Sequence, residues 1–187
     1  MEAGSVGVLR ALGAIAARHE VRVALEFLGF ADCSVNTLEA CGQVVERVNR
    51  PNVGLVLDTF HFYAGNSSLK SIAALDPRKL FMVHLNDVMP GPRARLHDAR
   101  RIYPGDGVLP LAPILRALRA IGYPGIFSVE VFQPRSWRQD PIQVATTAYR
   151  KARAGKIEKE SIPAAYAIPE DGRAAPLPHA LGSRELT

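Results

Sequence analysis

The sequence predicts an α/β fold in which helices cover a parallel sheet. Two observations lead to this prediction: four short apolar runs rich in branched residues, and the stretches with helical apolar spacing that separate them. Parallel strands are joined by long crossover connections that pack back on the sheet, so this alternation is typical of such a fold. A chain of 187 residues is long enough for one domain with a sizeable core.

Each expected element has its own local signal. The strands are brief, are bounded by Gly, Pro or Asn, and cover residues 21–27, 53–58, 80–85 and 126–131. Apolar residues at helical spacing predict helices over residues 6–19, 36–49, 68–75, 110–121 and 140–153. Pro110 suits a first helical turn, and Gly122 suits a helix end. Because the order starts with a helix, we expect the first strand–helix unit to lack its strand.

Residues 1–154 form the predicted domain, a single parallel α/β unit. From about residue 155 the sequence becomes rich in Pro and Ala, with charges but no sustained apolar period. Such a segment has too little apolar surface to bury for its folding to be favourable. We therefore expect residues 155–187 to form a flexible tail.

Composition and charge exclude several classes of protein. Hydrophobic residues make up 48% and charged residues 22% of the chain, as in ordinary globular proteins. The chain has no apolar run near the roughly 20 residues of a membrane helix and no secretion signal at its start, so we expect a cytoplasmic protein without a membrane partner. The formal charge is +5, but the arginines are scattered without interleaved aromatic residues, which argues against a nucleic-acid partner.

A lone acid or histidine stands at or near the C-terminal end of each expected strand. These residues are Glu26, Asp58, His84 and Glu130. In a parallel barrel such strand ends open on one face, where groups from different strands meet. Side chains alternate along a strand, and all four share one parity, whereas the opposite positions are almost wholly aliphatic. The four polar side chains are therefore predicted to face the same interior.

Three carboxylates at one place imply a compensating charge. They repel one another and are costly to desolvate unless protons or a cation offset them. One divalent ion would do so, and three carboxylates with one imidazole suit Mn²⁺, Mg²⁺, Co²⁺ or Zn²⁺. Taken singly, an acid at a strand end is more often a helix cap, and a histidine more often belongs to the core. The agreement of four successive strands favours a metal site.

Four motifs make the chain recognisable. They are Asp58-Thr-Phe-His61, His84-Leu-Asn-Asp87, Arg101-Ile-Tyr-Pro-Gly-Asp-Gly107 and the segment from Gly122 to Phe132. In combination they resemble the xylose-isomerase-like superfamily of sugar phosphate isomerases and epimerases, above all its inosose isomerase and ketose 3-epimerase branch. The resemblance covers about residues 21–153. It implies a partial (β/α)8 TIM barrel made of about four C-terminal β/α units.

The resemblance also implies roles for individual residues. The family's metal ligands correspond to Glu26, Asp58, His84 and Glu130, and its substrate-binding residues to His61 and Arg101. The implied activity is a metal-dependent isomerase or epimerase of a small sugar, ketose or inosose, in which Glu26 and Glu130 move a proton through an enediolate intermediate. A dehydratase using the same site and an inactive half-barrel fragment or subunit stay open as alternatives. An endonuclease-IV-like repair enzyme would need more histidines than the sequence supplies.

The expected sheet is only half of a barrel. A closed barrel of this kind has eight strands, and this chain supplies four. Four strands leave two unpaired edges and an open apolar interior. We expect either a homo-oligomer or a separately encoded N-terminal half-barrel to cover them.

Four further residues have two interpretations each. Asp87 either orients His84 as a hydrogen-bond acceptor or caps the following loop. His97 and Asp98 belong to an Arg-rich loop that either covers the site or is solvated. Trp137 either walls the pocket or has a packing role.

Overall fold

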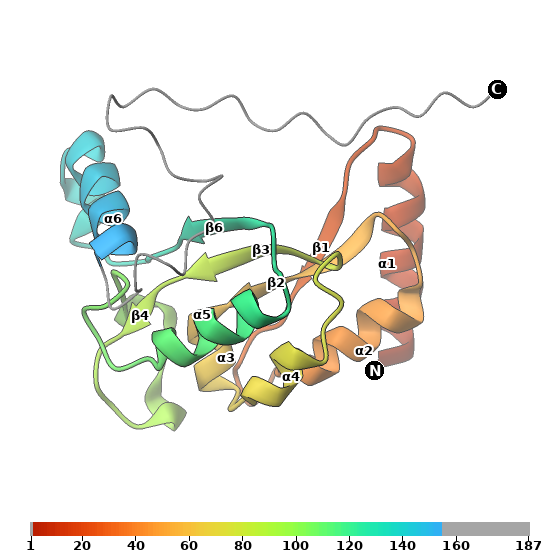
Figure 1. Cartoon of the computed structure of the whole chain (residues 1–187), viewed down its shortest axis with the longest axis horizontal. Helices are drawn as coiled ribbons and strands as arrows, with labels where there is room; N and C mark the ends of the chain where they lie inside the picture. Colours follow the sequence, from red (N-terminus) through yellow and green to blue (C-terminus); the bar gives the residue numbers. More distant parts are fainter. Residues whose placement is uncertain (1, 155–187) are drawn as a thin grey trace.

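The computed structural model describes residues 2–154 of the chain. The expected tail, residues 155–187, lies outside these residues and stays a prediction. Strands and helices alternate along the described chain (Figure 1). The strands are β1 (Val23–Glu26), β2 (Val53–Asp58), β3 (Leu80–Leu85), β4 (Asp87–Val88), β5 (Arg101–Ile102) and β6 (Ile126–Val129). The α-helices are α1 (Glu2–Ala17), α2 (Leu38–Val48), α3 (Thr59–Ala64), α4 (Leu69–Ala73), α5 (Leu111–Ala120) and α6 (Pro141–Ala154), and the short 3-10 helices are η1 (Arg93–Arg95), η2 (Asp98–Arg100) and η3 (Ser136–Arg138).

The four predicted strands form one parallel sheet in the order β1-β2-β3-β6. This confirms the predicted α/β fold with a parallel sheet. Asp58 of β2 pairs with His84 of β3, which pairs in turn with Ser128 of β6. Glu26 pairs with Val56, so it lies one inward-facing position before Asp58. The register therefore places the four predicted metal ligands at one end of the sheet and on one face.

The opposite face of the sheet carries the core. Leu57, Val83 and Leu85 are buried there, as the aliphatic parity predicts. Helices α2, α4 and α5 lie along this side of the sheet (Figure 1). Apolar stripes on α2 and α5 supply the matching buried residues, and Thr37 caps α2 by accepting a hydrogen bond from the amide of Ala40. No helix among residues 2–154 is both long and apolar enough to span a membrane.

The sequence pattern does not predict helix α3, which follows β2 without a loop. Its residues are mostly aromatic or β-branched and have low helix propensity. Two tertiary facts override this propensity. Phe60 and Phe62 are buried in the core, and the Asp58 side chain accepts a hydrogen bond from the amide of His61 at the helix start.

A small antiparallel ladder between β4 and β5 is also not predicted. It pairs Asp87 with Ile102 and Val88 with Arg101, and it closes the loop of residues 89–100. The ladder brings Arg101 back beside the end of β3.

Leu57 provides a test of the core. It is 0% exposed and lies in the central strand β2, so Leu57→Ala should lower the free energy of unfolding by about 2–5 kcal/mol. Val8→Ala changes an exposed residue of α1 and should alter it by less than about 0.5 kcal/mol. Urea unfolding followed by circular dichroism measures both values. Equal effects of the two substitutions would contradict this description of the core.

Candidate metal centre

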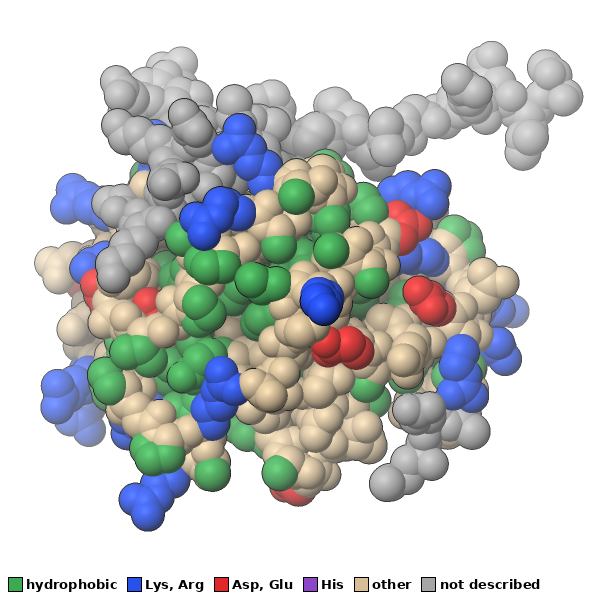
Figure 2. Space-filling model, turned by 60° about the horizontal axis from the view of Figure 1, so that its bottom comes forward, with side chains coloured by type: hydrophobic (Ala, Val, Ile, Leu, Met, Phe, Trp, Pro, Cys, Tyr) green, Lys and Arg blue, Asp and Glu red, His purple; other side chains and the backbone are tan. Residues whose placement is uncertain are grey.

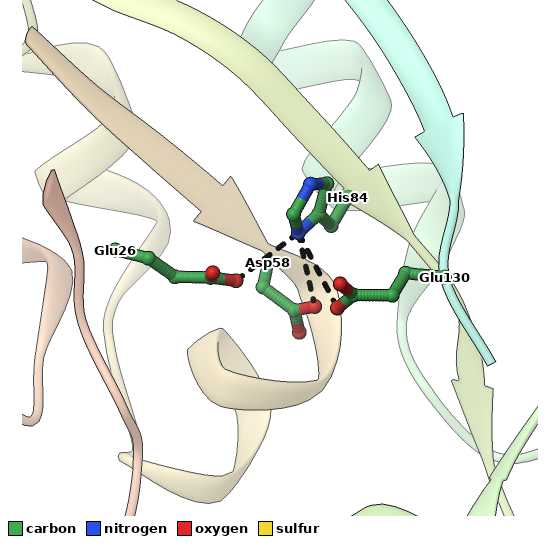
Figure 3. A group of neighbouring side chains, drawn as sticks. All are labelled: Glu26, Asp58, His84 and Glu130. Atoms are coloured by element: carbon green, nitrogen blue, oxygen red, sulfur yellow. Dashed lines mark hydrogen bonds and ion pairs between the residues drawn. The ribbon is translucent and has the colours of Figure 1, made fainter. Parts of the chain in front are cut away.

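The side chains of Glu26, Asp58, His84 and Glu130 converge at the C-terminal end of the sheet (Figure 3). Each contributes one potential ligand atom, and these atoms all lie within 4.8 Å of one another. His84 Nδ1 is 3.1 Å from Glu26 Oε1, 3.3 Å from Glu130 Oε2 and 3.9 Å from Asp58 Oδ2. The structure thus brings together the whole set of predicted ligands.

Backbone pairing sets the position of each ligand. Asp58 and His84 are paired neighbours on β2 and β3, so their side chains point to the same side at the same height. Glu26 ends β1, and Glu130 directly follows β6, where its amide donates to Leu85 O at 3.3 Å. In Figure 3, Glu26 and Glu130 approach His84 from opposite sides.

Asp58 caps helix α3 with one oxygen and faces the cluster with the other. Its side chain is 0% exposed, and Oδ1 accepts the amide hydrogen of His61 at 2.9 Å, which makes it a helix cap. The other oxygen, Oδ2, faces His84 and accepts hydrogen bonds from Asn86 Nδ2 at 3.0 Å and from Arg101 Nη1. Burial raises the pKa of Asp58 to about 6, against the opposing effect of Arg101.

Asn86 and Thr59 belong to the site but escaped the sequence interpretation. Asn86 Oδ1 accepts from the Thr59 hydroxyl at 2.8 Å, and that hydroxyl accepts from the backbone N–H of Asn86 at 3.0 Å. Both residues are buried. The signal was present for Asn86, because it lies two residues after His84 and therefore shares its parity.

The cluster strongly favours positive charge. Hydrogen bonds from His84 to Glu130 and Glu26 raise the pKa of His84 to about 10, despite its partial burial. The same contact with His84 lowers the pKa of Glu130. Three carboxylate oxygens and one imidazole nitrogen form a hard, mostly anionic donor set, which fits a divalent cation.

Arg101 lies against this cluster with only 1% of its surface exposed. Its Nη1 contacts Asp58 Oδ2 and lies 3.1 Å from Glu130 Oε2, while Nε donates to Asp98 Oδ1 at 2.9 Å. The guanidinium carbon lies 4.5 Å from the centre of the Phe60 ring, in cation–π geometry. The predicted substrate-binding arginine is therefore held by the acids around it.

His61 is buried between Arg101 and the loop after β1. Gly29 N donates to His61 Nδ1 at 3.1 Å, and Arg101 Nη2 lies 3.0 Å from His61 Nε2. Burial, reinforced by the positive charge of Arg101, lowers the pKa of His61 to about 4. A side chain at Gly29 would collide with His61 O and Gly65 N, so glycine permits this close approach.

The structure decides between the interpretations of Asp87. Its carboxylate accepts hydrogen bonds from the amides of Gly105, Gly107 and Leu109 at 2.8–3.1 Å. Asp87 also accepts from the amide of Val88 at 2.8 Å. It therefore anchors the loop that leads to α5, and the suggestion that it orients His84 is wrong.

The structure also decides between the interpretations of His97, Asp98 and Trp137. Asp98 reaches the site through its bond to Arg101, whereas His97 is exposed next to it. Trp137 is 72% exposed and lines a groove between β6 and α6 with Val131 and Val144. It does not wall the four-ligand cluster.

The pKa of His84 predicts how stability depends on pH in the metal-free chain. Because this pKa is raised from 6.5 to about 10, the stabilisation is complete below pH 6.5 and is lost as pH rises through about 10. In EDTA, the free energy of unfolding should therefore fall more steeply with rising pH for the wild type than for His84→Gln. Urea unfolding at several pH values measures both slopes, and identical slopes would contradict the charged state of His84.

Known proteins share this arrangement of strands and helices. Residues 4–152 match the family model described as xylose isomerase-like TIM barrel. The chain is 42% identical over 144 residues to the inosose isomerase of Bacillus subtilis (strain 168). This alignment covers 77% of this chain and 52% of that protein. It is 36% identical over 126 residues to a 3-dehydroshikimate dehydratase of Pseudomonas aeruginosa. That alignment covers 66% of this chain and 20% of that protein. The chain spans about half the length of the curated inosose isomerases it matches.

A solved structure gives the same result. The chain superposes on a crystal structure of the IOLI protein with a bound zinc atom with a TM-score of 0.82 and 37% sequence identity, covering 87% of this chain and 58% of that one. The zinc of that protein and the four converging side chains of this one support the predicted divalent-metal cofactor. The fold, the motifs and the match over residues 4–152 agree, and the chain belongs to the xylose isomerase-like TIM barrel family.

Proposed function

We propose that this chain carries the catalytic centre of a metal-dependent isomerase that acts on a small polyhydroxylated ketone of the inosose class. The observation that carries the proposal is the placement of two glutamates on opposite sides of His84, with all ligand atoms within 4.8 Å (Figure 3). The 42% identity to an inosose isomerase supports the choice of substrate class.

The metal would be held by Glu26 Oε1, Asp58 Oδ2, His84 Nδ1 and Glu130 Oε2, the atoms that face one another in the cluster. A bound divalent ion polarises a substrate carbonyl and the adjacent hydroxyl, and this acidifies the C–H bond beside them. The side chains of Glu26 and Glu130 are 30% and 29% exposed, so they are the ligands most open to a substrate.

These two glutamates would move the proton. One carboxylate removes it from the carbon that bears the hydroxyl, which leaves an enediolate, and the other returns a proton. Return to the neighbouring carbon gives isomerisation, whereas return to the opposite face of the same carbon gives epimerisation. His61 and Arg101 lie beside the cluster, and we expect their N–H groups to stabilise negative charge on substrate oxygens.

Dehydration is the second candidate reaction. It is favoured by the 36% identity to a 3-dehydroshikimate dehydratase, since the same proton removal can be followed by loss of a neighbouring hydroxyl. The proton-moving residues would be the same, and only the fate of the hydroxyl would differ.

We also propose that further strands complete the barrel. Within the described residues, β1 and β6 are each paired along one edge only. A second copy would supply the four missing strands. However, at each junction between the two copies, α6 of one copy and α1 of the other would lie between the same two strands, where a barrel holds only one helix. Four strands joined by three helices would fit, either in the same polypeptide or in a separate one. The helix count therefore favours a complementary half-barrel over a homodimer.

Catalysis by the glutamates is tested by substitution. Glu26→Gln and Glu130→Gln should each lower the rate of deuterium exchange from D₂O into inosose by about 10²–10⁴-fold, because each removes a proton-transferring group. Glu46→Gln, on the exposed side of α2, is the matched control and should leave the rate unchanged. Exchange that persists in both site variants would contradict the assignment.

The product separates the two candidate reactions. Mass spectrometry after incubation with inosose should show a product of unchanged mass if the chain isomerises it. A product lighter by one water would identify a dehydratase instead.

Completion of the barrel is tested by sedimentation. The full chain mixed with the part of the Bacillus subtilis inosose isomerase that it does not match should form a one-to-one complex. A stable dimer of the chain alone that does not bind the fragment would contradict the proposed complementary half-barrel.

A further inference from the structure

We infer that Arg101 is a built-in counter-ion that competes with the metal: a divalent cation binds when Arg101 Nη1 leaves Asp58 Oδ2 and Glu130 Oε2. The inference rests on the metal-binding part of the proposed function and is independent of the reaction catalysed. It gives Arg101 a role in the metal-free protein that its expected contact with substrate does not include.

A single nitrogen carries the competition. Arg101 Nη1 contacts Asp58 Oδ2 and lies 3.1 Å from Glu130 Oε2. These are the same two oxygens that face His84 Nδ1 within the cluster, at 3.9 Å and 3.3 Å. Arg101 therefore occupies acceptor positions on two of the four candidate ligand atoms.

The hydrogen bonds of Asp58 show which donor must leave. A carboxylate oxygen offers about two lone-pair positions, and Oδ2 already accepts from Asn86 and Arg101. Asn86 is buried, and its amide oxygen is fixed by the Thr59 hydroxyl at 2.8 Å. The Asn86 side-chain amide is therefore held in place. Arg101 reaches the site from the short strand β5 on a long side chain, so it is the donor that would leave.

The contact between Arg101 and His61 is unfavourable in the observed arrangement. Gly29 N–H points at His61 Nδ1, and the Arg101 Nη2 hydrogens point at His61 Nε2. A neutral imidazole carries a proton on one of these nitrogens, so in either tautomer one contact sets a donor against a donor. A doubly protonated ring would set both contacts in conflict. Movement of Arg101 removes this conflict.

Arg101 also has a route away from the cluster. Its Nε is bonded to Asp98, which is half-exposed, and its guanidinium lies 5.2 Å from the ring of Phe132, which is also partly exposed. Neither partner is one of the four candidate ligands. They can retain the side chain while Nη1 withdraws from the acids.

Zinc affinity tests the inference. If Arg101 competes with the metal, its removal should strengthen Zn²⁺ binding; if Arg101 supports the site, its removal should weaken Zn²⁺ binding. Arg101→Met should bind Zn²⁺ about tenfold more tightly than the wild type, since the substitution frees two ligand oxygens and removes one positive charge beside the ion. The dissociation constant is measured on the full chain by competition with a chelating dye. Arg78→Met is the matched control, because Arg78 forms an exposed ion pair with Asp76 and its loss should leave the affinity unchanged.

The wild-type protein provides a second measurement in case Arg101→Met does not fold. Addition of Zn²⁺ should shift the side-chain Nε–H NMR signal of Arg101 and leave that of Arg78 in place. Weaker Zn²⁺ binding by Arg101→Met, or an Arg101 signal unmoved at saturation, would overturn this inference while metal binding stands. A wild-type chain that binds no Zn²⁺ would overturn the proposed function as well.

Discussion

The junction of β2 and α3 holds a fully buried carboxylate, Asp58, and the order of the site depends on how its charge is compensated. One oxygen fixes the start of α3 through the amide of His61. The other ties in the end of β3 through Asn86 and the returning loop through Arg101. A buried carboxylate without such partners costs several kcal/mol. Three segments distant in sequence are therefore held together by one side chain.

A second buried acid, Asp87, organises the neighbouring loop by different means. Its charge is compensated by backbone amides, including those of Gly105, Gly107 and Leu109, instead of by cations. These bonds and the β4–β5 ladder direct the loop back over the end of β3. The loop thereby delivers Arg101 to Asp58. The two acids follow successive strands and have different roles: Asp87 anchors the loop, and Asp58 is part of the four-residue cluster.

The two faces of the sheet differ in a way that matches a half-barrel. The helix-covered face is closed by aliphatic residues such as Leu57 and Val83, which are fully buried. On the other face Ile126 is 43% exposed and Ala24 is exposed. Figure 2 shows Lys and Arg side chains spread around one side of the molecule instead of gathered in a single patch, as expected for a solvated basic surface. The polar mouth and the open interior are therefore the surfaces at which ligands and further strands would meet the chain.

The parallel α/β fold and the convergence of four polar side chains could be predicted from the sequence, because both follow from local periodicity. Period two along each strand assigns Glu26, Asp58, His84 and Glu130 to one parity, and parallel strands bring their ends to one mouth. The contacts between these residues depend on tertiary packing, which the sequence pattern does not report. Helix α3 forms against its propensity because the core buries Phe60 and Asp58 caps it, and no local pattern reports such burial. The bridge from Arg101 to two ligand oxygens likewise depends on a ladder between residues far apart in the chain, so spacing along the sequence could not reveal it.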